Sequence, residues 1–142
     1  MTREAAVPAA EAAIDLDLLR ATAASMGLDV QLDPRALRAY ACYAEALVAA
    51  NHRLNLTRIS GPRDMAVQHV LDSLVCLRGT DPSIAPDAPL RLVDVGSGPG
   101  LPGLALKIAR PAWRLTLVES VGKKAAFLRA LTELPELGLA GT

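Results

Sequence analysis

The stretch LVDVGSGPGLPG at residues 92–103 decides the fold of this chain. Its first four residues are typical of a buried strand, and its last eight contain four glycines. Glycine adopts positive φ readily and has no Cβ that would hold a ligand away from the backbone. The helix expected after the turn presents unpaired N–H groups, which form a polar surface for a ligand. The stretch therefore predicts a site for a nucleotide-like cofactor.

The spacing of the glycines distinguishes two classes of cofactor. A dinucleotide fingerprint is G-x-G-x-x-G, in which the third glycine lets the helix pack close to the strand. Gly96 and Gly98 fit it, but Leu101 occupies the third position, and Gly100 comes one residue early. With Asp94 two residues before the first glycine, the pattern D-x-G-x-G-x-G resembles the first motif of S-adenosylmethionine-dependent methyltransferases. An NAD(P)-dependent Rossmann oxidoreductase remains the alternative.

Two acidic residues accompany the glycine turn. Glu119 lies at the carboxyl end of the second expected strand, 19 residues past Gly100. We expect its carboxylate to accept the two ribose hydroxyls of the cofactor; the alternative is a solvent-exposed acid at a strand end. Asp94 lies inside the first strand, and we expect it to orient the turn by accepting backbone N–H groups.

The periodicity of apolar residues changes at a proline-rich segment. Before it, helical spacing predicts three helices, at 11–26, from Pro34 onward with Asp33 as N-cap, and from Ser60-Gly61-Pro62 to about Leu77. After it, strands at 90–95 and 114–119 alternate with helices at 101–109 and 122–134.

The fold class expected from this order is α/β: an N-terminal helical segment followed by the first half (β-α-β-α) of a Rossmann-like class I methyltransferase fold. The expected division is a helical region at 1–79, a proline-rich connector at 80–89 and an incomplete cofactor-binding domain at 90–142.

Apolar faces predict what two of the helices bury. The face expected for the helix after Asp33 consists of Leu37, Tyr40, Ala44, Leu47 and Val48. The face expected for the last helix consists of Ala126, Phe127, Ala130 and Leu134. Cys42 and Cys76 share no metal-ligand spacing, and we expect both to be small buried hydrophobes in a reducing compartment.

Four motifs occur in an order that resembles one family. They are NLT at 55–57, MAVQHVLDS at 65–73, DVGSGPGLPG at 94–103 and VESVGKKAAFLR at 118–129. Over about residues 33–134 the chain resembles the bacterial small-subunit ribosomal RNA guanine-N7 methyltransferases, also called the glucose-inhibited division protein B family. The resemblance implies an enzyme that uses S-adenosyl-L-methionine to methylate N7 of one guanine in the decoding-region loop of 16S rRNA.

The resemblance also suggests site residues. It implies cofactor contacts at Gly96 and Leu101, and Gly98, Gly100 and Glu119 complete the predicted pocket from the residues themselves. Guanine N7 carries no proton, so attack on the methyl group requires alignment rather than a general base. No catalytic residue and no metal ligand is predicted.

Basic side chains are concentrated near the predicted cofactor turn. The net charge is zero, but residues 107–129 hold six basic and one acidic side chain, and residues 1–33 hold two basic and six acidic ones. The six are Lys107, Arg110, Arg114, Lys123, Lys124 and Arg129. Such a cluster suits a polyanion, and we predict that Lys123, Lys124 and Arg129 bind 16S rRNA or the small ribosomal subunit. The alternative is a solvated helix face.

His69 and Asp72 lie three residues apart on one expected helix face. Two such residues do not make a metal site. We expect a hydrogen-bonded pair that fixes this helix against the glycine turn.

The number of strands limits the activity expected of this chain. A complete methyltransferase sheet has several more strands than two, and PELGLAGT after Leu134 adds none. We therefore expect a C-terminally truncated family member that binds S-adenosylmethionine weakly, if at all, and does not methylate RNA by itself. A non-catalytic RNA-binding module is a further alternative. No apolar run approaches a membrane span, and residues 1–10 do not resemble a signal peptide, which predicts a cytoplasmic location.

Overall fold

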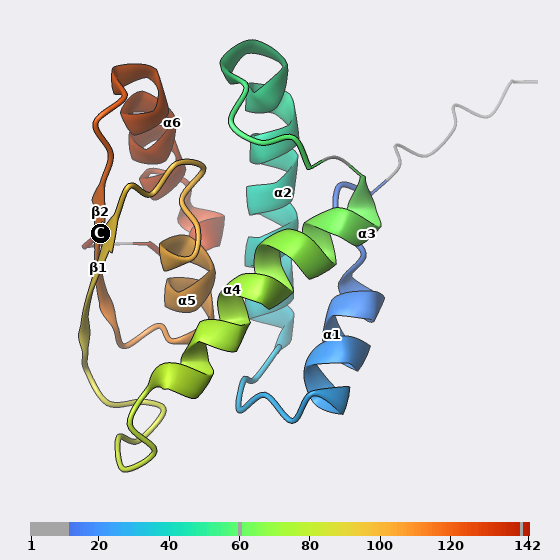
Figure 1. The fold of residues 1–142 in the computed structure, drawn as a ribbon, viewed down its shortest axis with the longest axis vertical. Coiled ribbons are helices and arrows are strands. Elements are labelled where there is room, and N and C mark those ends of the chain that lie inside the picture. Colours follow the sequence, from blue (N-terminus) through green and yellow to red (C-terminus); the bar gives the residue numbers. More distant parts are fainter. Residues whose placement is uncertain (1–11, 60, 140) are drawn as a thin grey trace, which may run out of the picture.

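The structure is a computed structural model that describes residues 12–59, 61–139 and 141–142 (Figure 1). Its longest helix, α2, stands between α1 on one side and the sheet with α5 and α6 on the other. The helices are α1 (Leu16–Ser25), α2 (Pro34–Leu54), α3 (Pro62–Asp64), α4 (Asp72–Val75), α5 (Gly103–Ala109) and α6 (Gly122–Thr132). The strands are β1 (Arg91–Val95) and β2 (Arg114–Val118).

The two strands form a parallel pair connected through α5. Their register runs from Arg91 opposite Arg114 to Val95 opposite Val118. A parallel pair needs such a crossover, and the β-α-β-α order expected from the sequence is confirmed. The helices cover one face of this sheet. The other face is open, and the valines on it are 58%, 78% and 45% exposed: Val93, Val95 and Val118.

Helix α2 begins where its sequence predicts. The Asp33 carboxylate accepts a hydrogen bond from the backbone N–H of Ala36 at 2.7 Å, and Pro34 occupies the first turn. The expected buried face is wrong at Val48, which is exposed. Alanines on the neighbouring positions let α2 pack closely, so its buried face is rotated toward them. That face consists of Ala36, Ala39, Tyr40, Tyr43, Ala44, Leu47 and Ala50.

The third helical run changes type along its length. It starts at Pro62, as expected, and continues to Gly79 through α3, the π-helical segment η1 (Met65–Leu71), α4 and the 3₁₀ segment η2 (Cys76–Gly79). A π-helix is wider than an α-helix, and apolar periodicity at 3.6 residues does not predict it. Cys76 lies in the surface 3₁₀ turn and is exposed, and Cys42 is only half-buried, so the expectation that both cysteines are buried is wrong for Cys76 and met only in part by Cys42. Ser60 is outside the described residues.

The first helix, α1, is shorter than the range expected. The Asp15 side chain caps it by accepting a hydrogen bond from the N–H of Leu18 at 2.9 Å. Gly27, with φ of +62°, follows its end, as its position predicts. Residue 11, where we expected this helix to start, is outside the described residues.

The face that the last helix, α6, buries matches the expected one only in part: Phe127 is buried as predicted, but the two alanines are not. Phe127, Leu128 and Leu131 are buried, whereas Ala126 and Ala130 are exposed. The face is rotated because the chain after α6 folds back through η3 (Pro135–Leu137) and packs against α2 and α6. Leu137 and Leu139 in that return are almost fully buried.

A single apolar core runs from α1 to the C-terminal return. It contains residues from α2, η1 and α5 as well as from the sheet, so the helices before the proline-rich connector and the sheet after it share their buried side chains. In the part of the chain that the structure describes, no helix is both long enough and apolar enough to cross a membrane.

Candidate cofactor site

The glycine turn lies at the carboxyl end of β1 and is bonded to the end of β2. The N–H groups of Gly96 and Ser97 both donate to the carbonyl of Val118, at 2.7 and 3.1 Å. The Ser97 hydroxyl donates to the carbonyl of Asp94 at 2.9 Å. The Gly100 N–H donates to the carbonyl of Ser97 at 2.7 Å. The turn is therefore held in shape without a ligand.

The first half of the turn leaves its backbone uncovered. Gly96 has φ of +77° and Gly98 φ of +53°, a region that L side chains rarely adopt. A Cβ added at Gly96 would meet no atom within 4 Å, and one at Gly98 would meet only the Gly96 carbonyl oxygen at 4.0 Å. Bare backbone beside open space is the arrangement that lets a ligand approach closely.

The second half of the turn is packed against the core. A Cβ added at Gly100, where φ is +97°, would collide with the side chain of Leu104 and lie 3.1 Å from Leu128. A Cβ at Gly103 would lie 2.7 Å from the Asp94 carboxylate and 3.0 Å from Leu115. These two glycines make room for protein side chains.

Asp94 connects the strand to the helix that follows the turn. Its Oδ2 accepts the N–H of Gly103 at 2.8 Å, as expected, and burial raises the pKa of this carboxyl. The N–H of Leu104 donates to the Gly100 carbonyl at 2.8 Å. The expectation that α5 presents unpaired N–H groups to a ligand is therefore wrong for these first two residues, because both N–H groups have partners inside the protein.

Glu119 lies beside the open half of the turn. Its Oε1 accepts the N–H of Val121 at 2.9 Å, and its Oε2 accepts the N–H of Gly98 at 2.8 Å. These two hydrogen bonds hold the pKa of the carboxyl below its usual range. An ionised carboxylate has more lone-pair sites than the two used here, so it retains capacity for further donors.

Two tyrosines of α2 bond to the turn and to α5, and neither contact was identified from the sequence. The Tyr43 hydroxyl donates to the carbonyl of Pro99 at 3.0 Å, and the Tyr40 hydroxyl donates to that of Ala105 at 2.9 Å. Burial raises the pKa of both phenols. The only available signal was two tyrosines three residues apart on an apolar helix face in a chain with few aromatics.

The six basic residues near the turn do not form one surface. Lys123 and Arg129 on α6 are exposed and Lys124 is half-buried. Lys107 is buried and donates to the carbonyls of Pro111, at 2.8 Å, and Trp113, and burial lowers its pKa. Arg110 is also buried, so only part of the predicted cluster can meet a polyanion.

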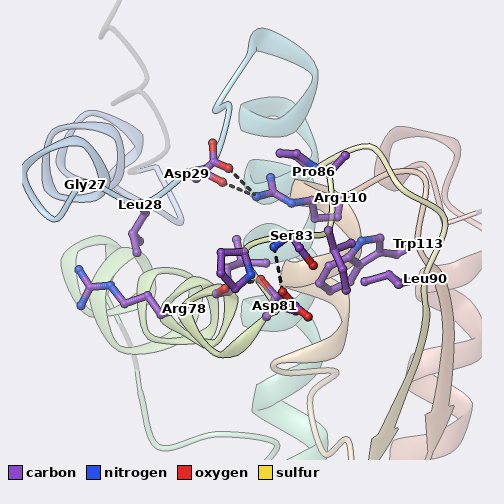
Figure 2. Close-up of a pocket in the computed structure, with 15 residues that line it drawn as sticks. Gly27, Leu28, Asp29, Arg78, Asp81, Ser83, Pro86, Leu90, Arg110 and Trp113 are labelled. Atoms are coloured by element: carbon purple, nitrogen blue, oxygen red, sulfur yellow. Dashed lines mark hydrogen bonds and ion pairs between the residues drawn. The ribbon is translucent and has the colours of Figure 1, made fainter.

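A cavity of about 410 Å³ lies at the end of the strands opposite the glycine turn (Figure 2). Figure 2 shows the Arg110 guanidinium directed toward Asp29, whose backbone carbonyl accepts its hydrogen bond. Leu90 and Trp113, which precede β1 and β2, also line this cavity. It therefore lies at the amino ends of the strands, away from the glycine turn.

His69 is bonded to a different partner from the one expected. Its Nε2 is 2.9 Å from the Thr57 hydroxyl, whereas Asp72 is exposed. His69 lies in the π-helical segment η1, and burial lowers the pKa of its imidazole. Among the described residues, no group of three or more His, Cys, Asp or Glu side chains could hold a metal ion.

Known proteins resemble this chain over most of its length. The rRNA small subunit methyltransferase G family model, GidB, matches residues 36–140, from α2 to the C-terminal return. The ribosomal RNA small subunit methyltransferase G of Roseiflexus sp. is 47% identical over 122 residues, which is 86% of this chain and 49% of the relative. The protein of the same name from Leptothrix cholodnii is 43% identical over 129 residues, 87% of this chain and 56% of the relative.

The relatives are longer than this chain. A third, from Stenotrophomonas maltophilia, is 46% identical over 116 residues, covering 82% of this chain and 49% of the relative. The chain thus spans about half the length of the curated relatives it matches. The match includes the glycine turn, both strands and α6, and it confirms the family suggested by the motifs. The chain belongs to the rRNA small subunit methyltransferase G family.

Proposed function

We propose that this chain contributes the S-adenosyl-L-methionine site of a methyltransferase that modifies N7 of a guanine in 16S rRNA. The observation that supports it best is the uncovered backbone of Gly96 and Gly98 beside the Glu119 carboxylate. Space without a Cβ and an ionised acceptor suit the methionine part and the ribose hydroxyls, respectively. Family membership favours the same cofactor.

Five residues form the proposed cofactor site. Gly96, Gly98 and Leu101 contact the cofactor along the backbone, and Glu119 accepts the ribose hydroxyls. Gly100 contributes indirectly. Leu104 and Leu128 pack where a Cβ of residue 100 would lie, and this packing supports the turn. No metal takes part in this proposal.

In the proposed methyl transfer, the main task of the protein is to align the reacting groups. When bound, the cofactor supplies an electrophilic methyl group on a sulfonium. Guanine N7 offers a lone pair without a proton, so no side chain is proposed as a general base. The contribution of this chain is to hold the reacting groups in line and to fix the turn, through Tyr43 and Asp94, before the ligand arrives.

The proposed RNA contacts are on α6. Lys123 and Lys124 lie in its first turn, just after Glu119, and Arg129 lies in its last. Arg129 and Glu119 line one cavity of about 300 Å³ beside β2, which places a cation next to the proposed cofactor site. The proposed partner is 16S rRNA or the small ribosomal subunit, in the cytoplasm.

The proposed division of the chain has three parts: a helical region at 1–79, a connector at 80–89 and a cofactor-binding region at 90–142.

Two alternatives make different predictions. An NAD(P) oxidoreductase needs a glycine where Leu101 stands, and the family relationship does not favour it. A non-catalytic RNA-binding module would keep the contacts of α6 and would not bind the cofactor.

The open face of the sheet, with Val93 and Val95 exposed, leaves one side of the turn without cover and favours weak cofactor binding.

Thermal unfolding with added ligands separates these candidates. We expect S-adenosylhomocysteine to raise Tm and NADH to leave it unchanged. Glu119→Ala should abolish the shift, and the matched control Glu45→Ala, an exposed acid on α2, should retain it. A shift with NADH, or a shift that survives Glu119→Ala, contradicts the proposed site.

Direct binding and methyl transfer complete the test. Isothermal titration should give an affinity for S-adenosylmethionine weaker than micromolar, and micromolar binding would contradict the expectation of weak binding. Methyl transfer to 30S particles is measured with this chain and, as the positive control, with the longer Roseiflexus relative. The proposal stands only if the relative methylates N7 of a guanine. Methylation by the relative at another atom contradicts it.

A further inference from the structure

The chain that leaves α2 is held in a fixed conformation. The Asn51 side chain pairs with the backbone of Thr57: its Nδ2 donates to the Thr57 carbonyl and its Oδ1 accepts the Thr57 N–H, both at 2.9 Å. The Thr57 hydroxyl accepts the N–H of Ile59 at 3.0 Å. Asn55, between them, adopts the left-handed conformation at φ of +48°. Segment 55–59 is therefore a turn whose conformation is fixed by side-chain hydrogen bonds.

A buried histidine fixes the same segment from the other side. The Thr57 hydroxyl is 2.9 Å from Nε2 of His69, which lies in the π-helical segment η1. His69 and Leu56 are both buried, so the turn is fastened to the core by one polar and one apolar contact. π-Helical turns occur frequently at functional sites.

Three exposed arginines lie in this turn or in the helices that flank it, and Asp64 follows the third of them. Arg53, Arg58 and Arg63 are exposed, and residues 46–63 contain no Asp or Glu. In the described part of the chain, the two ion pairs involve other arginines, Arg35 and Arg110. We call Arg53 at the end of α2, Arg58 in the turn and Arg63 in α3 the arginine turn.

Arg53, in the last turn of α2, lies at the same end of the molecule as the proposed cofactor site. Tyr43 joins α2 to the glycine turn at Pro99, and α2 continues for eleven residues beyond it, a rise of about 16 Å. In Figure 1 the end of α2, the glycine turn and the start of α6 all lie toward the top of the view. Arg53 at the end of α2 and the lysines at the start of α6 therefore lie on two sides of the glycine turn, whereas Arg63 lies in α3, where the Pro62 carbonyl accepts the N–H of Asp15.

We propose that the arginine turn is a second RNA-contacting surface, held in place by Asn51, Thr57 and His69. The inference rests on the proposed function, because it names how the same RNA substrate is positioned. Guanidinium groups bind phosphates, and phosphates held on both sides of the glycine turn orient the RNA across it. Asn51, Thr57 and His69 are positioning residues that act through the arginines.

Salt-dependent RNA binding tests the arginine turn. Fluorescence anisotropy measures the affinity of a labelled 16S decoding-region hairpin for the wild type, for a variant with Arg53→Ala, Arg58→Ala and Arg63→Ala, and for a matched control. The control combines Arg20→Ala, Arg91→Ala and Arg114→Ala, which removes three exposed arginines from α1 and from the amino ends of the strands.

We expect the arginine-turn variant to bind at least tenfold more weakly and the control to bind within about twofold of the wild type. Loss of three phosphate contacts makes the negative slope of log K against log salt shallower by about 2. Equal effects of the variant and its control overturn the inference.

A second pair of variants tests positioning without removing charge. Thr57→Val removes the hydroxyl that joins Ile59 and His69, and we expect RNA affinity to fall several-fold although all three arginines remain. Thr57→Ser restores the hydroxyl and is expected to restore affinity. Wild-type affinity in Thr57→Val, with unchanged thermal unfolding, contradicts the positioning role.

The two proposals fail in distinguishable ways. If the arginine-turn variant binds like the wild type while Lys123→Ala with Lys124→Ala loses affinity, the further inference is wrong and the RNA contact of α6 stands. If the wild type itself does not bind the hairpin, the RNA partner in the proposed function is wrong, and the inference falls with it.

Discussion

Gly96 and Gly98 belong to the first half of the glycine turn and Gly100 and Gly103 to the second, and the surroundings of the two pairs differ. The first pair has positive φ and open space above its backbone. The second pair is in contact with the core, where an added Cβ would meet Asp94, Leu104, Leu115 and Leu128. One motif thus combines two glycines beside open space, where the cofactor is proposed to lie, with two glycines that packing requires, and glycine spacing alone does not separate them.

Each half of the turn also has its own carboxylate. Glu119 accepts the N–H of Gly98, and Asp94 accepts that of Gly103, both at 2.8 Å. Hydrogen bonds lower the pKa of Glu119, whereas burial raises that of Asp94. The same side-chain group is therefore stabilised in its charged form beside the open half and disfavoured in that form beneath the packed half.

Gly100→Ala is expected to have the largest effect on stability. The new Cβ combines an unfavourable φ of +97° with a collision against Leu104, so we expect a loss of about 3 kcal/mol or more in the free energy of unfolding. Urea unfolding measures it. Gly122→Ala is the control, because a Cβ there meets nothing within 4 Å. Equal stabilities of the two variants would show that the second half of the turn is not tightly packed.

Gly103→Ala is expected to be less severe, because only packing is disturbed. A Cβ there lies 2.7 Å from the Asp94 carboxylate and 3.0 Å from Leu115, and overpacking of this kind costs about 1–3 kcal/mol. Urea unfolding in parallel with Gly100→Ala ranks the two. A loss larger than that of Gly100→Ala would mean that backbone conformation contributes little at position 100.

Gly98→Ala should separate binding from stability. Its cost to folding is about 1–2 kcal/mol from positive φ alone, since no atom other than the Gly96 carbonyl oxygen lies within 4 Å. We expect it to abolish the Tm shift caused by S-adenosylhomocysteine while the protein stays folded. If the ligand shift persists, the open half of the turn is not where the cofactor lies.

The two carboxylates should give small pH effects of opposite sign. Glu119 has a folded pKa below its usual 4.5, so its contribution to stability is present above that value and is lost as the pH falls through the folded pKa. Asp94 has a folded pKa above its usual 3.8, so the native state gains stability relative to Asp94→Asn as the pH falls through the folded pKa toward that value. Unfolding of the wild type, Glu119→Gln and Asp94→Asn over a pH series measures both. Parallel pH profiles in the two variants would contradict the assigned directions.

Local signals predicted much of the fold correctly. Asp33-Pro34 indicated where α2 starts, and Gly27 indicated where α1 ends, because caps and positive φ depend on neighbouring residues. The strand, the turn and the role of Asp94 were likewise predicted from a few adjacent positions. The assigned cofactor roles of the turn residues, Glu119 included, stay predictions.

The errors concern which partner a side chain meets. Lys107 was expected to belong to a basic cluster and instead binds carbonyls at its own helix end. Val48 was expected inside and Cys76 buried, and both are exposed. The face of α6 was misplaced because it depends on Leu137 and Leu139, which return to it from the end of the chain.

The family of the chain was suggested by the resemblance of its motifs and confirmed by its relatives. The sequence by itself determined the alternation of strands and helices and the conformation of the glycine turn. These depend on short stretches whose φ requirements and apolar periods are local. Only the tertiary structure decided that Tyr43 supports Pro99 and that Arg35 donates to the carbonyl of Ile108, residues 56 and 73 positions apart. Such contacts depend on how α2 packs against the α/β unit, and packing is set by all the side chains of the core together.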